Sequence, residues 1–281
     1  MALPVETEER RAVHALEIDL LLRGLFERYG YDFRNYARAS ITRRIRRAMQ
    51  VEAVTTVSSL QARLLHDAEA AMRFVASISV HTTAMFRDAD VYSMLRSDVV
   101  PLLRTYPFVR IWHAGCSTGE EVYSLAILLE ELGVYERCRM YATDISDVIL
   151  DRARQGIVPL AKMREYTQNY QRSGGTEDFS SYYTADQENA VFRSSLKRNI
   201  VFSQHNLVSD SMFNEFQLIV CRNVLLYFDE QLRDRAHELF HSSLSPLGTL
   251  VLGKKESLRF TRFAPRYREM HDNLQIYRRL V

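Results

Sequence analysis

Two consecutive acids follow a glycine turn near the middle of the chain. The stretch "RIWHAGCSTGEEVYS" covers residues 110–124 and places Gly115 and Gly119 ahead of Glu120 and Glu121. A glycine turn that opens a helix is typical of an anion site, because backbone N–H groups and the positive helix end favour negative charge. Two carboxylates at that position repel an anion. The stretch therefore favours a cationic ligand over a pyrophosphate, with Glu121 as its carboxylate and Glu120 as a structural residue.

A third acid is spaced to recognise a nucleoside. Asp144 ends the apolar run "RMYATD", at roughly the usual interval between a glycine turn and the carboxylate that binds two ribose hydroxyls. The alternative is that Asp144 caps a helix that begins near Ser146. S-adenosylmethionine is a nucleoside with positive charge: its ribose suits Asp144, and its ammonium and sulfonium groups suit a glutamate. A nicotinamide dehydrogenase is disfavoured by the two glutamates.

Short apolar runs alternate with helical patterns from residue 108 onward. The candidate strands are 108–113, 139–144, 199–204, 216–221 and 248–253, and the candidate helices between them are 119–133, 146–155 and 229–244. This alternation predicts a doubly wound α/β fold, with a mainly parallel sheet covered on both faces. The last residues indicate two short strands around Asp272 and Asn273, which form an antiparallel edge hairpin.

Polar residues follow the ends of the predicted strands. The glycine turn follows the first strand, Asp144 ends the second, Asn206 follows the third, and Arg222 and Asn223 follow the fourth. In doubly wound sheets, ligands bind outside the carboxyl ends of the strands. The pattern therefore predicts one ligand site at that edge of the sheet.

The chain divides into three parts and an insertion. Residues 1–78 are expected to form a small all-α domain, with helical patterns from about Glu17, and 79–107 a linker that contains a helix from Ala89 to Leu103. Residues 108–281 form the Rossmann-like domain. The polar stretch 157–198 is too long for a plain crossover, so it is expected to be an inserted antiparallel β-subdomain with helical turns.

One helix of the N-terminal part is rich in arginine. The sequence "ASITRRIRRAMQ" places Ile41, Ile45 and Met49 on one stripe. The arginines that fan out around this stripe are Arg43, Arg44, Arg46 and Arg47. They form either an ordinary solvated face or a docking surface for an acidic partner.

Composition excludes several classes of protein. The 37 Lys and Arg nearly balance the 35 Asp and Glu, so no attraction to nucleic acid is expected. The three cysteines lack metal-binding spacing, and no metal is expected. No apolar run approaches the ~20 residues that span a bilayer, and the N-terminus lacks the pattern of a signal peptide. A cytoplasmic protein without membrane insertion is expected.

Four motifs together resemble the chemotaxis receptor methyltransferases, the CheR family. They are "TTAMFRD" (82–88), "AGCSTGEE" (114–121), "NL" (206–207) and "CRNVLLYF" (221–228), and the likeness covers nearly the whole chain. The resemblance implies a class I S-adenosylmethionine methyltransferase fold. It also implies methyl transfer to glutamate side chains on the cytoplasmic helices of a methyl-accepting chemotaxis receptor, which gives methyl esters for sensory adaptation. A monomer recruited to receptor arrays is expected.

The resemblance assigns roles to individual residues. The cofactor contacts are Thr83, Arg87, Glu121, Asp144, Asn206, Leu207, Asn223 and Val224, with Gly115 in the turn and His81 where the family commonly has Asn. Arg87 and Tyr227 match the residues that position the substrate carboxylate. A carboxylate substrate with a pKa of about 4.3 needs no general base at neutral pH. The receptor's glutamates favour the docking interpretation of the arginine helix.

Alternatives remain at the level of the sequence. Arg87 could pair only with Asp88 or Asp90, and Tyr227 could be a core aromatic residue. The whole chain could be a methyltransferase of the same fold that acts on another protein or a small acid, or a scaffold that binds S-adenosylmethionine without catalysis. The loop around 174–191 looks longer than in members that bind a receptor's C-terminal pentapeptide, which predicts a pentapeptide-independent enzyme.

Overall fold

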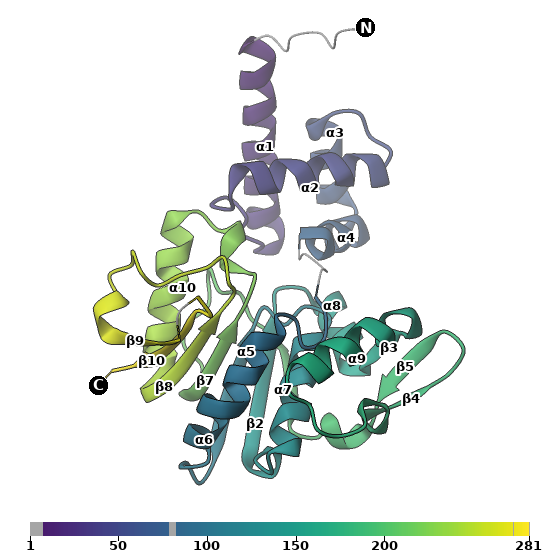
Figure 1. Cartoon of the computed structure of the whole chain (residues 1–281). Helices are drawn as coiled ribbons and strands as arrows, with labels where there is room; N and C mark the ends of the chain where they lie inside the picture. The colour runs from purple at the N-terminus through teal and green to yellow at the C-terminus, as the bar shows by residue number, and fades with distance from the viewer. Residues whose placement is uncertain (1–7, 79–82, 272, 281) are drawn as a thin grey trace, which may run out of the picture. The chain divides into compact units, whose positions relative to one another are not determined.

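The computed structural model describes residues 8–78, 83–271 and 273–280. Contacts between residues divide the chain into two compact units (Figure 1). The helical unit comprises Met1–Ser79 with Tyr227–Leu232, and the α/β unit comprises Val80–Leu226 with Arg233–Val281. Each unit is described by itself.

Four helices make up residues 8–78 of the helical unit. They are α1 (Glu8–Tyr29), α2 (Arg38–Val51), α3 (Val57–His66) and α4 (Ala68–Ile78). Leu21 and Leu25 are buried as the spacing predicts, and α1 ends before Gly30, whose φ of 77° suits a residue without a Cβ. The helix begins at Glu8, earlier than the expected Glu17, because the preceding Glu, Arg and Ala residues are good helix formers.

A short segment from late in the chain packs with these helices. The N–H of Ala37 donates to the Tyr227 carbonyl at 2.8 Å, and the N–H of Asp229 donates to the Asn35 carbonyl at 3.0 Å. The rings of Tyr36 and Phe228 lie 5.1 Å apart. The segment Tyr227–Leu232 is therefore part of the helical unit, which the sequence pattern did not indicate.

The α/β unit is built on a seven-stranded sheet. Its strands are β1 (Val109–Ala114), β2 (Cys138–Asp144), β6 (Ile200–Gln204), β7 (Phe216–Cys221), β8 (Leu244–Leu252), β9 (Tyr267–His271) and β10 (Ile276–Arg279). Their order is β6-β2-β1-β7-β8-β10-β9. The pairs from β6 to β8 are parallel, and β10 is antiparallel to both β8 and β9. The doubly wound mixed sheet and its edge hairpin are confirmed, although Asp272 lies outside the described residues.

Helices cover both faces of this sheet. The helices are α5 (Ala89–Met94), a π-helical turn (Leu95–Val99), α6 (Val100–Leu103), α7 (Glu120–Glu131), α8 (Asp147–Gln155) and α10 (Glu230–Ser243). Ile111 of β1 shares a core with Leu95 and Leu125, whereas its neighbour Trp112 lies against Phe240 of α10, with ring centroids 5.6 Å apart. Successive residues of a strand face opposite sides, so one strand fills two cores.

The insertion forms a small subdomain, as predicted. It contains β3 (Ile157–Pro159), α9 (Met163–Arg172), β4 (Tyr183–Ala185) and β5 (Asn189–Phe192), and its three strands pair antiparallel in the order β3-β5-β4. Tyr123 of α7 stacks on Phe192, with ring centroids 4.7 Å apart. This contact joins the subdomain to the helix that follows the glycine turn. None of the described helices has the length and hydropathy to cross a membrane.

Candidate active site

The turn after β1 is bonded directly to the end of β2. The N–H groups of Gly115 and Cys116 both donate to the Thr143 carbonyl at 2.8 Å. The N–H of Ser117 donates to Asp144 Oδ2 at 3.0 Å, and the N–H of Ser146 donates to Asp144 Oδ1 at 3.2 Å. Asp144 thus fixes the turn and also bonds the N–H of Ser146, which precedes the first residue of α8. The side chain lies at the predicted edge of the sheet, and a carboxylate can accept about four hydrogen bonds.

Gly115 has a conformation and a packing that exclude other residues. Its φ is +73°, and a Cβ at this position would clash with Val224 Cγ2. Val224 lies in the loop after β7, and its side chain packs directly on the turn after β1. The absence of a side chain at Gly115 is what lets the loops after β1 and β7 meet.

Four of the eight described non-glycine residues with positive φ lie in these loops. Phe86, Asp88, Ser117 and Asn223 have φ angles of 50°, 57°, 49° and 61°. Residues other than glycine rarely adopt such angles, and each instance costs about 1–3 kcal/mol unless the surroundings hold it. All four lie in loops that carry predicted site residues. This clustering is typical of a ligand site.

Glu121 lies in a buried charge cluster. Glu121 is 6% exposed and pairs with the guanidinium of Arg222, which is 4% exposed. Arg222 Nη2 also bonds Asp88 Oδ2 at 2.5 Å, and its Nη1 donates to the Arg87 carbonyl at 3.1 Å. Burial raises the pKa of the Glu121 carboxyl, and Arg222 opposes that shift.

The charges in this cluster do not balance. The guanidinium of Arg222 bonds the carboxylates of Glu121 and Asp88. The guanidinium of Arg87 and the carboxylate of Glu256 also act on Glu121, so three carboxylates face two guanidinium groups, which leaves one negative charge over. In a poorly solvated site this surplus attracts a cationic ligand. The sequence argument reached the same sign of charge without Arg222, to which it assigned no role. Asp88 was also missed, because the sequence suggested it only as a partner for Arg87.

Glu120 makes a different, local contact. It is 4% exposed and accepts a hydrogen bond from Thr118 Oγ1 at 2.5 Å. Burial raises the pKa of its carboxyl, and the Thr118 hydroxyl opposes the shift. Glu120 therefore bonds within its own turn, whereas Glu121 belongs to the buried cluster.

A fourth acid, Glu256, supports the loop after β7. Its Oε2 accepts the N–H groups of Asn223 at 3.0 Å and Gly253 at 2.6 Å, and its Oε1 accepts the N–H of Leu226 at 3.3 Å. Burial raises the pKa of this carboxyl, and these backbone bonds oppose the shift. The sequence analysis missed Glu256. The feature of the sequence that could have identified it is an acid three residues beyond Gly253, just after β8.

The remaining predicted contacts lie along the same edge. Asn206 Oδ1 accepts the N–H of Val208 at 2.9 Å, and Leu207 is 8% exposed. The N–H of His205 donates to the Asp144 carbonyl at 3.1 Å, which brings this loop to the end of β2. His81 lies outside the described residues, so its proposed contact stays a prediction.

Three buried side-chain atoms in these loops have no hydrogen-bond partner among the described residues. Thr83 Oγ1, Ser117 Oγ and Asn223 Oδ1 make no hydrogen bond to any described residue. Buried polar atoms are normally hydrogen-bonded, so these three are available to a bound ligand. Together with Asp144 for a ribose and the surplus negative charge for an ammonium, they fit S-adenosylmethionine.

The alternative proposed for Arg87 is weakened. Asp88 bonds Arg222, and Asp90 pairs with Lys254 at 2.6 Å. Both acids named as structural partners of Arg87 are thus bound to other cations. Tyr227 belongs to the helical unit, where its ring lies against Arg44.

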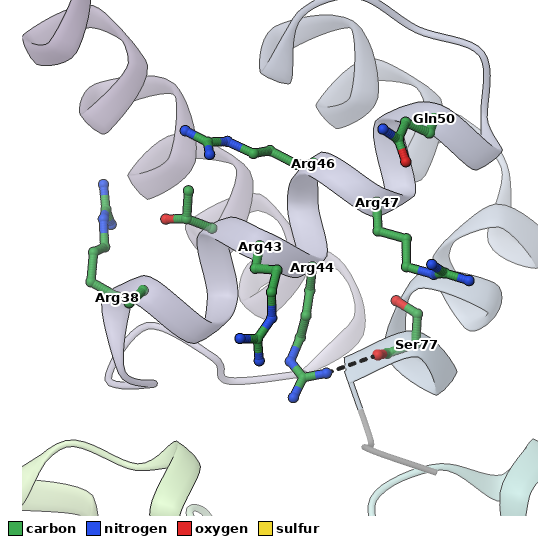
Figure 2. Close-up of a pocket in the computed structure, with 9 residues that line it drawn as sticks. Arg38, Arg43, Arg44, Arg46, Arg47, Gln50 and Ser77 are labelled. Atoms are coloured by element: carbon green, nitrogen blue, oxygen red, sulfur yellow. Dashed lines mark hydrogen bonds between the residues drawn. The ribbon is translucent and has the colours of Figure 1, made fainter. Parts of the chain in front are cut away.

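The arginine helix α2 differs from its prediction at one residue. Figure 2 shows Arg43 and Arg44 extending from the same side of α2, with Arg46 and Arg47 directed elsewhere. Arg43, Arg46 and Arg47 are exposed, but Arg44 is only 9% exposed. Its Nη1 donates to the Ser77 carbonyl at 3.2 Å, and its guanidinium lies 4.9 Å from the centre of the Tyr227 ring. Arg44 is therefore not on the exposed face, because α4 and Tyr227 cover it.

A hollow of about 950 Å³ opens beside these arginines (Figure 2). It is lined by Arg38, Ala39, Thr42, Arg43, Arg44, Arg46, Arg47, Gln50 and Ser77. None of these nine described residues is acidic. The hollow is therefore a region of strong positive charge within the helical unit.

The fold and this site define a class I S-adenosylmethionine-dependent methyltransferase. The family model described as "CheR methyltransferase, SAM binding domain" matches residues 81–270, and "CheR methyltransferase, all-alpha domain" matches residues 16–79. The chain belongs to the CheR methyltransferase family, and S-adenosylmethionine is its cofactor.

Curated relatives agree with this assignment. "Putative methyltransferase Cher3" of Pseudomonas putida is 50% identical over 264 residues, which cover 94% of this chain and 97% of that protein. A "Chemotaxis protein methyltransferase" of Listeria innocua is 31% identical over 82% of this chain and 85% of that protein. "Chemotaxis protein methyltransferase 2" of Pseudomonas aeruginosa is 32% identical over 66% of each.

Proposed function

We propose that this enzyme transfers a methyl group from S-adenosylmethionine to glutamate side chains on the cytoplasmic helices of a chemoreceptor, forming methyl esters. The observation that carries the proposal is the buried cluster that joins the cofactor acid Glu121 to the loop of Arg87 through Arg222. Because Arg222 bonds both the Arg87 carbonyl and Glu121, the loop that carries Arg87 lies beside Glu121, and this supports a substrate carboxylate held by Arg87 close to the cofactor's cation. The names of the Listeria and Pseudomonas aeruginosa relatives support chemotaxis as the process.

The chemistry asks the protein mainly for alignment. When bound, the cofactor supplies a methyl group activated by a positively charged sulfur. A glutamate side chain is already ionised at neutral pH, so no residue of the enzyme has to remove a proton. Arg87 offers parallel N–H donors that match a carboxylate. Holding a carboxylate oxygen about 3–3.5 Å from the reacting carbon supplies several kcal/mol through proximity and orientation.

The chemical nature of the product tests this proposal. The purified enzyme is incubated with methyl-labelled S-adenosylmethionine and a receptor cytoplasmic fragment, and the labelled receptor is then treated with mild base. Release of the label as methanol is expected, because a carboxyl ester hydrolyses under these conditions. Base-stable label would indicate another acceptor group, and cofactor binding without any transfer would indicate a scaffold.

The exposed arginines of α2 are proposed to dock the receptor, whose methylation sites present glutamates. Arg43→Glu combined with Arg47→Glu is expected to raise the KM for the receptor by about tenfold at low salt, because like charges then meet. The effect should shrink as salt screens these exposed charges. The cofactor Kd, measured by calorimetry, should not change.

A matched control reverses two exposed arginines of α1, Arg23 and Arg28, which makes the same change in net charge. This control should leave the receptor KM within about twofold, since exposed surface charges outside a docking surface contribute little. An equal rise in KM for both double variants would show that net charge, rather than the surface of α2, governs receptor binding.

A further inference from the structure

Arg222 is a deeply buried charge of the α/β unit that touches more than one loop. It follows β7 directly, and its side chain is 1% exposed. Its guanidinium contacts the Arg87 carbonyl, the Asp88 carboxylate and the Glu121 carboxylate. A planar group with five donors can hold three acceptors in fixed directions, which the single ammonium of a lysine cannot do.

The loop that Arg222 holds has an unfavourable backbone. Phe86 and Asp88, on either side of Arg87, have φ angles of 50° and 57°. Such residues keep these conformations only when their surroundings fix them. The N–H of Phe86 donates to Ser124 Oγ at 2.9 Å. Arg222 bonds the Arg87 carbonyl and the Asp88 carboxylate. The direction in which Arg87 leaves the backbone is therefore set by α7 on one side and by Arg222 on the other.

We propose that Arg222 is a positioning residue for methyl transfer. It orients Arg87, and its contact with Glu121 links that orientation to the acid proposed to bind the cofactor. The inference rests on the proposed function, in which Arg87 aligns the substrate carboxylate. Arg222 itself need not touch the substrate. Its effect on the reaction passes through Arg87.

A double-mutant cycle tests this route. Arg222→Lys keeps the buried positive charge beside Glu121 but loses the fixed directions of the guanidinium. In the wild-type background we expect kcat for receptor methylation to fall about tenfold while the cofactor Kd stays within about threefold. In an Arg87→Lys background, the same substitution should lower kcat by less than about threefold, because the group that Arg222 positions is already altered.

A matched control separates positioning from general stability. Arg96 forms a partly buried ion pair with Glu131, at the opposite end of α7 from Glu121, and their side chains are 16% and 2% exposed. Arg96→Lys should lower Tm without changing kcat in either background. If Arg222→Lys behaves like Arg96→Lys, or if it lowers kcat by the same factor in both backgrounds, the proposal is wrong.

A second variant covers the case in which Arg222→Lys does not fold. Asp88→Asn keeps an acceptor oxygen for Arg222 and removes only a charge. Its effect on kcat should likewise be smaller in the Arg87→Lys background than in the wild-type background. Equal factors in both backgrounds would again overturn the proposal. If Arg87→Lys alone leaves receptor methylation unchanged, the proposed role of Arg87 is wrong. That result differs from equal factors in the two backgrounds, which would overturn only the role of Arg222.

Discussion

Asp144→Asn is expected to weaken the binding of S-adenosylmethionine about 30-fold, a loss of about 2 kcal/mol. The carboxylate accepts the N–H groups of Ser117 and Ser146, and it is placed to accept ribose hydroxyls as well. An asparagine presents an NH₂ group where one of these donors points, so one bond becomes a contact between two donors. Both the shape of the turn and the ribose contact are then impaired.

Calorimetry with S-adenosylmethionine and S-adenosylhomocysteine measures this effect, since both ligands share the ribose. Asp147→Asn is the matched control, because Asp147 is an exposed acid in the first turn of α8, three residues along. We expect the control to bind like wild type. A lowered Tm with unchanged affinity in Asp144→Asn would mean that the carboxylate only supports the backbone.

The placement of Asp144 shows how far the sequence reaches. Strands that alternate with helices dictate a parallel sheet, and a parallel sheet brings the carboxyl ends of its strands to one edge. The residues that follow these ends, such as Gly115, Asn206 and Asn223, could therefore be assigned to one site from local patterns alone. To place each of these residues, it is enough to recognise the strand that precedes it.

The contacts between these residues could not be predicted in the same way. Arg222 lies 101 residues from Glu121 and 134 from Asp88, and Glu256 lies 33 residues from Asn223. No local periodicity encodes which buried acid pairs with which buried base, because the pairing depends on how several loops pack together. Glu256 in particular serves backbone N–H groups, whose direction follows from the loop and not from residue types.

Arg44 illustrates a related limit. Helical spacing identifies the stripe of Ile41 and Ile45, both of which are 0% exposed. It cannot show that Tyr227, which is distant in sequence, covers an arginine beside that stripe. Periodicity gives the faces of a helix, whereas the partner that covers each face is decided by the rest of the chain.

Glu121→Gln and Glu120→Gln are expected to separate the roles of the two adjacent acids. Replacement of Glu121 removes one of the three carboxylates that face Arg222 and Arg87, so the cluster loses its surplus negative charge. Affinity for S-adenosylmethionine should then fall at least about tenfold, as expected for the loss of a charged partner in a buried site. In Glu120→Gln the amide oxygen can still accept the bond from Thr118, so affinity should stay within about threefold of wild type.

The pair of variants is informative because each removes the same charge from neighbouring positions of one helix. Calorimetry gives the affinities, and Tm measured without ligand shows whether either variant is merely less stable. Equal losses of affinity would mean that the cofactor responds to the total charge of the turn. A loss confined to Glu121→Gln would mean that the ligand's cation is recognised through the buried cluster, whose carboxylates outnumber its guanidinium groups.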